Sequence, residues 1–540
     1  MRYRTLSAFC TALVMLAALS FLPSGAMAVP AFTFADVQAK AQDLARTPYA
    51  ASAPVPEFLA KLSLEEWNAI RFRAEKALWA AEELPFTVQF FHPGLYYDRP
   101  VNIHIVGETS VDAVPFDSSL FQYGSEELGR KSAEAKGLGY AGFRVHYPLN
   151  RPDYKDEVAV FLGASYFRAL AKGNHYGISS RGLALDTACA QGEEFPYFKE
   201  FWLVRPKADA DSITIFALMD SPSLAGAYRF VIKPGSPTVM DVKCALFSRK
   251  GARNFEKVGL APLTSMFFYG EEKNGRPGDF RPEVHNSDGL ICTDGAQNWF
   301  WRPLTNPKRL IVNTFPLNSP RGFGLLQRDG DFKSYHDLAA RYEKRPSLWV
   351  IPQGDWGNGT LNLVEIPTED EMHDNIVAFW CPDKPRDPAK PDQPAAELRW
   401  PEMQMFQWKL FWMLPDVDLH DLGKAVSTRL SRNGDTLTFH VDFEGGTLDR
   451  LAPGTGLASV VDLPEFVTPV GKKLTYNPAV HGWRLEFSVR LPKEGGMLDS
   501  LMAARKGPLN LRFKALLKKG ENLPDAITET WIYDWQLQPQ

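Results

Sequence analysis

The sequence predicts an all-β protein made of two successive β-sandwich domains. From Pro85 onward, short strand-like segments follow one another, among them "FTVQFFH", "AGFRVHYPL", "SITIFALMDS" and "AYRFVIKPG". Turn residues separate these segments and no helical repeats lie between them, a pattern typical of antiparallel β-architecture. A chain of 540 residues is too long for one simple core. We therefore expect a large sheet that splits into two packed layers.

Helical periodicity is confined mainly to the start of the chain. The segment "FTFADVQAKAQDLARTPYA" places Phe34, Val37, Ala41 and Leu44 on one helix face, and Pro48 ends the pattern. A shorter helix is expected in "SLEEWNAIRF", where a serine can cap the first turn and acidic residues follow it.

A proline-rich segment, residues 381–396, divides the chain. It reads "CPDKPRDPAKPDQPAA" and has no apolar periodicity, so we expect a semi-rigid linker. Residues 29–380 would then form the large domain. Residues 397–540 contain alternating segments such as "WRLEFSVRL", and their number fits one smaller β-sandwich of immunoglobulin-like type.

Residues 1–28 have the organisation of an export signal. A short basic start is followed by a mostly apolar stretch and by "AMA", which ends at Ala28. This pattern predicts a Sec-type signal peptide cleaved after Ala28. No later segment approaches the roughly 20 apolar residues that cross a bilayer, so we expect an exported protein that does not span the membrane. In a Gram-negative cell its compartment would be the periplasm.

Charge and motif content exclude several classes of function. Without residues 1–28 the chain has 58 basic and 64 acidic side chains, a net charge of −6. Nucleic acid and anionic membrane surfaces reward positive charge, so neither is expected as the main partner. The sequence lacks GxxxxGK[ST], HExxH and GxSxG motifs, its histidines are scattered, and its four remaining cysteines form no CxxC pair. We expect no metal and no cofactor, and cysteines that act as small buried hydrophobes.

Carboxylates beside aromatic residues are the remaining candidates for chemistry. Cleavage of a glycosidic bond needs a protonated carboxyl and a second group that activates water or attacks the sugar. One region, "FRPEVHNSDGLICTDGAQNWFWRPL", supplies Glu283, His285, Asp288, Trp299 and Trp301. The two tryptophans alternate with Phe300 and share a strand face. That face could stack on a sugar, although core packing is the commoner use of such a pattern.

A second region, "LVEIPTEDEMHDNIVAFW", supplies four carboxyls in a predicted loop between two strands. Glu369, Asp370 and Glu371 lie at its tip and are expected to be solvated. Asp374 lies where the loop enters an apolar strand, and partial burial there would raise its pKa as an acid catalyst requires. The alternative is that Asp374 only caps the turn through backbone N–H groups.

Several long segments resemble one family, the periplasmic osmoregulated-glucan biosynthesis proteins of the G and D type. They include "LGYAGFRVHYPLN", "FLGASYFRALAKGNHYGISSRGLALDTA", "RPEVHNSDGL", "RPSLWVIPQGDWGNG" and "VEIPTEDEMHDNIVAFW". The resemblance runs from Phe32 to Trp380 and continues more weakly beyond. It implies a large β-supersandwich like that of galactose mutarotases, followed by an immunoglobulin-like sandwich. It also implies periplasmic work on β-1,2-glucan, linear or with β-1,6 branches, with the inner-membrane glucan synthase as a partner.

The resemblance also implies roles for individual residues. Members of the family include inverting glycoside hydrolases whose general acid is the aspartate of "DNIV", here Asp374. Their base-side aspartate follows the histidine of an "HDSD" segment, which reads "HNSD" here and gives Asn286. A neutral amide cannot accept a proton. Three outcomes stay open: Asp288 replaces the base, a sugar hydroxyl competes with water in a transglycosylase, or the site only binds glucan.

Other positions follow the family pattern around the glucan cleft. Tyr342 and Arg345 in "RYEKRP" match cleft positions, and Tyr342 could belong to a proton relay. Substrate contacts are expected from Arg345, His285, Glu283, Trp299, Trp301 and Trp356. The alternative to an enzyme is a non-catalytic glucan-binding or scaffold protein that assists the synthase. A mutarotase-type epimerase is suggested by fold analogy alone.

Overall fold

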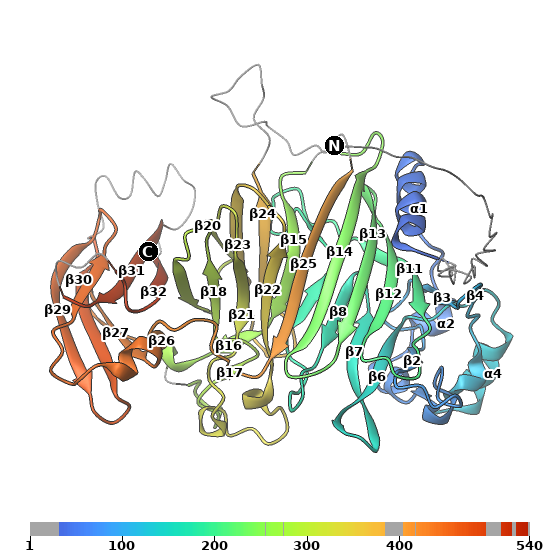
Figure 1. Ribbon diagram of the computed structural model, residues 1–540, viewed down its shortest axis with the longest axis horizontal. Coiled ribbons are helices and arrows are strands. Elements are labelled where there is room, and N and C mark those ends of the chain that lie inside the picture. The colour runs from blue at the N-terminus through green and yellow to red at the C-terminus, as the bar shows by residue number, and fades with distance from the viewer. Residues whose placement is uncertain are drawn as a thin grey trace, which may run out of the picture.

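The computed structural model describes residues 32–253, 255–273, 275–383, 403–415, 417–492, 509–520 and 525–537. The predicted signal peptide and residues 384–396 of the predicted linker lie outside these ranges, while Cys381 and Pro382 complete strand β24. The all-β prediction is confirmed, because two large sheets and a four-stranded sheet carry nearly all of the described elements (Figure 1).

The helices are few and most of them lie near the start of the chain. The α-helices are α1 (Phe34–Arg46), α2 (Glu57–Ala60), α3 (Leu64–Asn68) and α4 (Glu126–Glu134). The 3-10 helices are η1 (Ala74–Lys76), η2 (Ser118–Leu120), η3 (Glu271–Lys273), η4 (Phe332–Ser334), η5 (Tyr342–Lys344) and η6 (Gly446–Arg450). The predicted first helix is α1, which packs on β12, β13 and β14 through Val37 and Ala41. Ser63 caps α3 as expected, since its side chain accepts the N–H of Glu66.

The first large sheet has ten strands. Its order is β2 (Thr87–Phe91), β6 (Gly142–Arg151), β7 (Tyr154–Leu162), β8 (Tyr166–Ala169), β9 (Ser179–Arg181), β15 (Val258–Ser265), β24 (Ile376–Pro382), β23 (Gly359–Glu365) and β20 (Ile311–Pro316), with β10 (Ala184–Leu185) also paired to β15. Two small pairs lie outside the large sheets: β1 (Arg71–Phe72) with β5 (Phe121–Gln122), and β16 (Phe267–Tyr269) with β17 (Val284–His285).

The second large sheet has fourteen strands and runs the length of the molecule. Its order is β28 (Ala458–Asp462), β31 (Leu509–Lys518), β32 (Thr530–Leu537), β19 (Trp299–Pro303), β18 (Gly289–Thr293), β21 (Gly322–Leu326), β22 (Ser347–Gln353), β25 (Gln404–Met413), β14 (Thr238–Ser248), β13 (Leu224–Lys233), β12 (Ile213–Asp220), β11 (Tyr197–Val204), β3 (Asn102–Val106) and β4 (Val111–Ala113).

Apolar side chains from the two large sheets meet in one core. Phe161 of the first sheet lies 5.1 Å from Phe230 of the second, measured between ring centres, and Phe167 lies 6.4 Å from Trp412. These contacts show that the two sheets pack face to face as a sandwich. The predicted likeness to galactose mutarotases remains a prediction at this level of detail.

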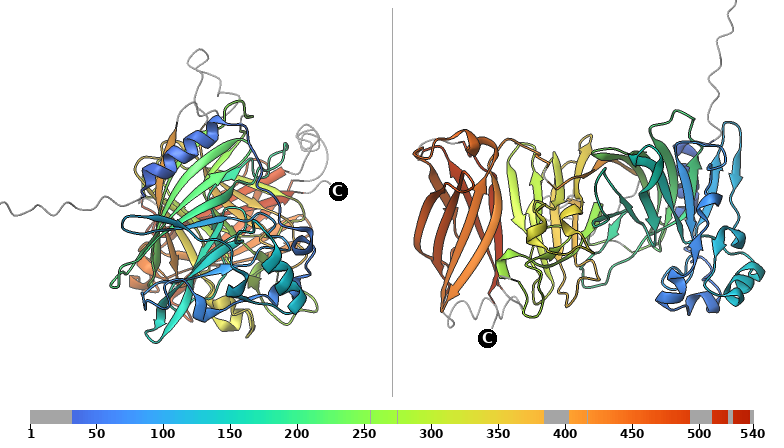
Figure 2. Two further views of the ribbon diagram at one scale, coloured as in Figure 1. Left: turned by 90° about the vertical axis from the view of Figure 1, so that its right-hand side faces the viewer. Right: turned by 90° about the horizontal axis from the view of Figure 1, so that it is seen from below.

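A smaller sandwich forms the other end of the molecule (Figure 2). Its four-stranded sheet consists of β26 (Lys424–Asn433), β27 (Thr436–Glu444), β30 (Gly482–Arg490) and β29 (Thr468–Asn477). Phe439 of this sheet contacts Phe513 and Trp531, which belong to the end of the fourteen-stranded sheet. That sheet continues into the large sandwich through the parallel pairing of β32 with β19. The immunoglobulin-like assignment remains a prediction.

Strand β25 follows the proline-rich segment in sequence but lies inside the large sandwich. It pairs with β14 on one side and with β22 on the other. The sequence division at residue 397 assigned this strand to the second domain, because its alternating pattern does not reveal its partners. We propose that the second domain begins after Met413 instead.

Two further features bear on the sequence expectations. Cys244, Cys292 and Cys381 are buried and Cys189 is half-buried. Within the described ranges, no helix is long and apolar enough to cross a membrane.

Candidate functional site

Asp374 and Asn286 lie at the same end of the ten-stranded sheet. Asp374 stands two residues before β24, whose first residue, Ile376, pairs with Ser265 at the end of β15. The carbonyl of Met266, the residue that follows β15, accepts the N–H of Asn286 at 2.8 Å. Strand register therefore brings together two segments that are almost 90 residues apart in sequence.

Arg345 and Tyr342 join this end of the sheet. Arg345 lies against Gly177, where a Cβ atom would meet the Arg345 Cβ at 3.0 Å. Gly177 stands just before β9, whose Ser179 pairs with Thr264 of β15. The guanidinium carbon of Arg345 is 5.3 Å from the ring centre of Tyr342. The absence of a side chain at Gly177 thus lets the Tyr342–Arg345 pair approach the sheet.

Asp374 has the electrostatics of a proton donor. Solvent reaches its side chain, yet dense protein around the carboxyl limits its hydration and raises its pKa. Arg168 and Arg181 partly oppose this rise, because their positive charges favour the carboxylate. A carboxyl with a raised pKa retains its proton at higher pH than an ordinary aspartate, as a general acid requires.

Arg168 and Arg181, the two arginines that act on Asp374, were not predicted from the sequence as residues of the site. Arg181 of β9 pairs across the sheet with Tyr166 of β8, and Arg168 of β8 donates to the Ser179 hydroxyl at 2.6 Å. The signal was present in "SYFRAL" and "ISSRGL", where a single arginine interrupts each strand-like segment. Only the pairing of β8 with β9 shows that the two cations face one carboxyl.

Buried polar atoms at this site without a hydrogen-bond partner among the described residues include Oδ1 of Asn286, Nε of Arg345 and Nε of Arg181. Asn286 is only 9% exposed. Buried polar atoms are normally satisfied by protein or water, so these atoms are well placed to bind a polar ligand.

Glu371 lies closer to the site than a solvated loop residue would. Its carboxylate forms an ion pair with Arg281 at 2.7 Å, and its charge acts on Tyr342. Burial, with Glu371 as the next cause, raises the pKa of Tyr342 to about 12. Tyr342 therefore holds its phenolic proton at neutral pH and can donate a hydrogen bond there.

His285 is a fully buried imidazolium. The Gln327 amide nitrogen donates to the carbonyls of His285 and Tyr342, so its amide oxygen must accept from His285 Nδ1 at 2.8 Å. The other ring nitrogen, Nε2, lies 3.0 Å from the Glu283 carboxylate and must donate as well. Burial disfavours the cation, but Glu283 outweighs it and the pKa of His285 rises to about 9. This network fixes the backbone that carries Asn286 and Tyr342.

Asp288 lies in a different environment from Asp374. Together with Glu283 and His285 it lines a cavity of about 50 Å³ that also includes Ser427 and Thr428 of the smaller sandwich. Its carboxylate accepts the backbone N–H groups of Arg328 and Asp329. Burial raises its pKa to about 6. Asp288 therefore faces the junction between the two sandwiches, whereas Asp374 faces Arg168 and Arg181.

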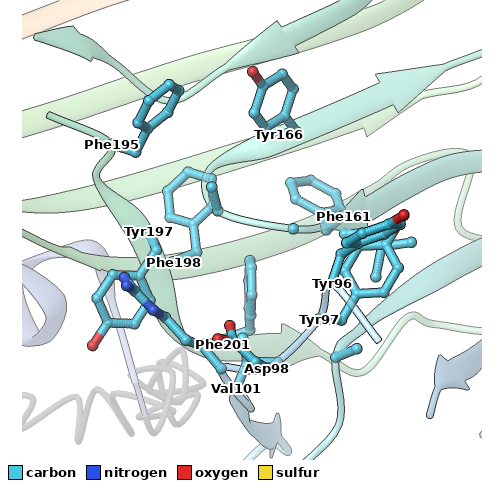
Figure 3. A pocket seen from close by; sticks show the side chains of 15 residues that line it. Tyr96, Tyr97, Asp98, Val101, Phe161, Tyr166, Phe195, Tyr197, Phe198 and Phe201 are labelled. Atoms are coloured by element: carbon cyan, nitrogen blue, oxygen red, sulfur yellow. The ribbon is translucent and has the colours of Figure 1, made fainter. Parts of the chain in front are cut away.

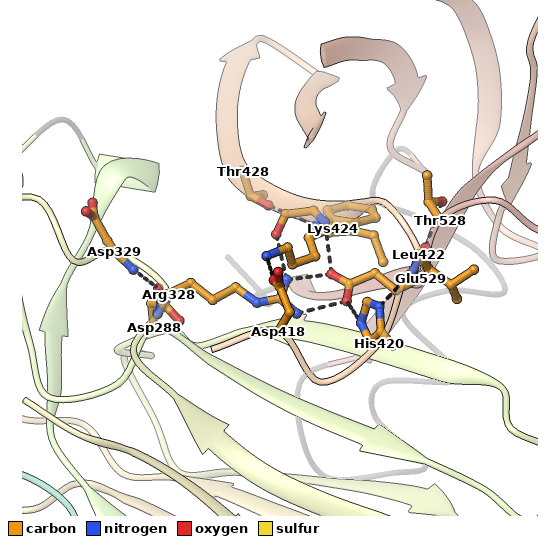
Figure 4. Close-up of polar contacts among 12 residues, drawn as sticks. Asp288, Arg328, Asp329, Asp418, His420, Leu422, Lys424, Thr428, Thr528 and Glu529 are labelled. Carbon is orange, nitrogen blue, oxygen red and sulfur yellow. Dashed lines mark hydrogen bonds and ion pairs between the residues drawn. The ribbon is translucent and has the colours of Figure 1, made fainter. Parts of the chain in front are cut away.

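The same junction is held by a buried ion network (Figure 4). Both terminal nitrogens of Arg328 bind the Glu529 carboxylate, at 2.5 and 2.8 Å, and His420 binds it at 3.1 Å. The Arg328 guanidinium also covers the ring of Trp301 at 3.5 Å. The residues around Asp288 thus connect the two sandwiches.

The three tryptophans expected to stack on sugar are packed against protein. Trp301 is 4% exposed and belongs to the apolar core shared with the smaller sandwich. Trp299 stacks on Trp349 and contacts His420. Trp356 is 7% exposed and packs on Trp380 and Trp408 in the main core. Trp301 and Trp356 leave little ring surface for a sugar, so core packing explains them better, whereas Trp299 is half-buried.

No group of three or more histidine, cysteine, aspartate or glutamate side chains in the described part of the chain has the geometry of a metal site. The candidate site therefore consists of a protonatable carboxyl, two arginines, a tyrosine–arginine pair and an amide. Fold and site together define a two-part β-sandwich protein with an acidic group at the end of one sheet.

Comparison with known proteins identifies the family. Residues 32–535 match the family described as periplasmic glucan biosynthesis protein, MdoG. "Glucans biosynthesis protein G" of Ralstonia nicotianae is 44% identical over 94% of this chain and 97% of its own length. The protein of the same name from Pseudomonas paraeruginosa is 42% identical over 96% of both chains. The chain belongs to this family of periplasmic glucan biosynthesis proteins.

Proposed function

We propose that this protein acts on the β-1,2-glucan backbone of osmoregulated periplasmic glucans, as an inverting glycoside hydrolase or a transglycosylase. Asp374 is the general acid. The observation that supports this role is the raised pKa of a solvent-accessible carboxyl that also feels the charges of Arg168 and Arg181. In this scheme the Asp374 carboxyl gives its proton to the glycosidic oxygen as the bond to the anomeric carbon breaks. The two arginines then stabilise the carboxylate that remains.

The other side of the bond needs a group that positions the nucleophile. Asn286 and Arg345 each offer a buried polar atom there, and Tyr342 offers a phenolic hydroxyl. None of these three groups is a strong base at neutral pH. The site therefore suits a nucleophile that is held by hydrogen bonds and loses its proton late to solvent, with Tyr342 accepting one proton while it passes its own on. A sugar hydroxyl bound in place of water would give transglycosylation.

A second candidate function is glucan binding without catalysis, in support of the inner-membrane glucan synthase. The observation that favours it is Asn286, because the family pattern places an aspartate at this position. A retained binding surface with a missing base would produce this behaviour.

One incubation separates these candidates. Purified protein is mixed with linear β-1,2-glucan between pH 5 and 8, and both chain lengths and reducing ends are measured. Hydrolysis shortens chains and creates reducing ends, whereas transglycosylation redistributes chain lengths at a constant number of ends. Glucan that binds but stays unchanged at high protein concentration would refute the enzymatic proposal and favour the binding protein.

A further inference from the structure

An aromatic pocket lies beside Asp374 and is not part of the site described above. It is a cavity of about 250 Å³ in the large sandwich (Figure 3). The aromatic rings that line it come from the loop after β2, from β8, and from β11 and the loop just before it. They include Tyr96, Tyr97, Tyr166, Phe195, Tyr197 and Phe198. This volume is below the range of about 300–1,000 Å³ that is usual for drug-sized ligands. The pocket suits a single small ring.

The floor of the pocket is rigid. Phe161, Phe198 and Phe201 are at most 2% exposed and belong to the main core. The hydroxyl of Tyr197 lies 2.8 Å from that of Ser52, and this hydrogen bond fixes its ring. The pocket therefore exists before a ligand enters, and binding requires little ordering of its floor.

The mouth of the pocket combines exposed aromatic faces with two side chains of opposite charge. Tyr96 is 80% exposed and Phe195 is 50% exposed. Aromatic faces exposed at the mouth of a cavity are accessible for stacking on a ligand. Asp98 and Arg99 also line the pocket, and their charges are opposite. This combination fits an uncharged ligand with one apolar face and a rim of hydroxyl groups.

Two arginines connect the pocket to Asp374. The guanidinium of Arg181 lies 4.8 Å from the ring centre of Tyr166 and 5.6 Å from that of Phe195. Arg181 also acts on the Asp374 carboxyl. The charge of Arg168 likewise acts on both Tyr97 and Asp374. The pocket thus adjoins the proposed site of bond cleavage.

We propose that this pocket binds one glucosyl unit of the glucan, with its ring stacked against Tyr96 or Phe195 and its hydroxyls bound by Asp98 and Arg99. The proposal rests on the proposed function, because the ligand is the same glucan chain whose neighbouring bond meets Asp374. A pyranose ring offers the apolar C–H face and the neutral hydroxyl rim that the pocket requires. The pocket anchors the chain and sets which bond reaches Asp374.

The test is a set of binding titrations with β-1,2-gluco-oligosaccharides of defined length, followed by calorimetry. The variants are Tyr96→Ala and Phe195→Ala, and the matched control is Tyr154→Ala, an exposed aromatic at the tip of the β6–β7 hairpin. We expect each pocket variant to raise Kd by about 10-fold, as loss of a central binding contact does. The control should stay within about twofold. Since all three side chains are exposed, the thermal midpoints should match the wild type.

The outcomes separate this proposal from the proposed function. Pocket variants that bind as tightly as Tyr154→Ala would overturn the pocket, even if the wild type cleaves glucan. Failure of the wild type to bind any oligosaccharide would also overturn it. Pocket variants that bind weakly, beside a wild type that binds but never converts glucan, would support the pocket and contradict only the enzymatic proposal.

Discussion

The buried imidazolium of His285 predicts a specific dependence of stability on pH. The pKa of His285 is raised from 6.5 to about 9, so the folded protein holds this proton more tightly than the unfolded chain does. The stabilisation is fully present below pH 6.5 and is lost as the pH rises through about 9. At about 1.4 kcal/mol per pKa unit, it amounts to about 3 kcal/mol.

The perturbation is the paired substitution Glu283→Gln with His285→Gln, which removes both charges together. The free energy of unfolding of the large sandwich is measured by urea titration with tryptophan fluorescence at several pH values from 6 to 9.5. The wild type should lose about 3 kcal/mol relative to the variant over this range. The control is His440→Gln, since His440 also faces a glutamate, at 3.2 Å, but is partly exposed. A difference that stays constant with pH would refute the imidazolium assignment.

Three further predictions follow from the site and from the junction between the sandwiches. Asn286→Asp should increase the rate of glucan hydrolysis, because a carboxylate can accept the proton that the amide cannot. An unchanged rate in the reducing-end assay would contradict the proposal that the site lacks a base at this position. Trp356→Phe should lower the thermal midpoint and leave the Kd for glucan within about twofold, since Trp356 is a core residue; a large loss of affinity at unchanged stability would restore it as a sugar platform. Glu529→Gln should destabilise the protein by about 3–5 kcal/mol in urea unfolding, because it leaves buried Arg328 without its counter-charge; a change below 1 kcal/mol would show that this ion pair is not important for the junction.

The positions of the strands could be predicted from the sequence, because they depend on the local alternation of apolar and polar residues. The apolar residues of "SITIFALMDS" and "AYRFVIKPG" give β12 and β13, and the periodicity of residues 34–46 gives α1. The position of β25 in the large sandwich could not be predicted, because alternation indicates which residues are buried and not which strands are neighbours. For the same reason the sequence could not show that the tryptophans pack against protein. Trp301 alternates as a sugar platform would, but only the packed sheet shows that Arg328 covers it.

In the candidate site, too, some residues could be predicted from the sequence, whereas others depend on contacts between segments that are distant in sequence. Asp374 could be singled out only through the resemblance of "DNIV" to the family segment, because its place before an apolar strand also allowed a residue that simply caps the turn. Arg168 and Arg181 depend on the pairing of β8 with β9, and the separation of Asp288 from Asp374 depends on how the second sandwich docks. Composition and spacing cannot supply either relation.

The role of Asp374 is tested most directly by comparing two substitutions in one loop. Asp374→Asn removes the proposed acid, whereas Asp370→Asn changes an exposed carboxyl four residues away whose partner is His373. General acid catalysis contributes about 10²-fold or more to the rate, or about 2.7 kcal/mol in activation free energy. We expect Asp374→Asn to lose at least this factor in turnover of β-1,2-glucan, and Asp370→Asn to keep the wild-type rate. The wild-type rate should also fall as the pH rises above the raised pKa of Asp374. A measurable wild-type activity that survives in Asp374→Asn would contradict the role of Asp374 as the general acid.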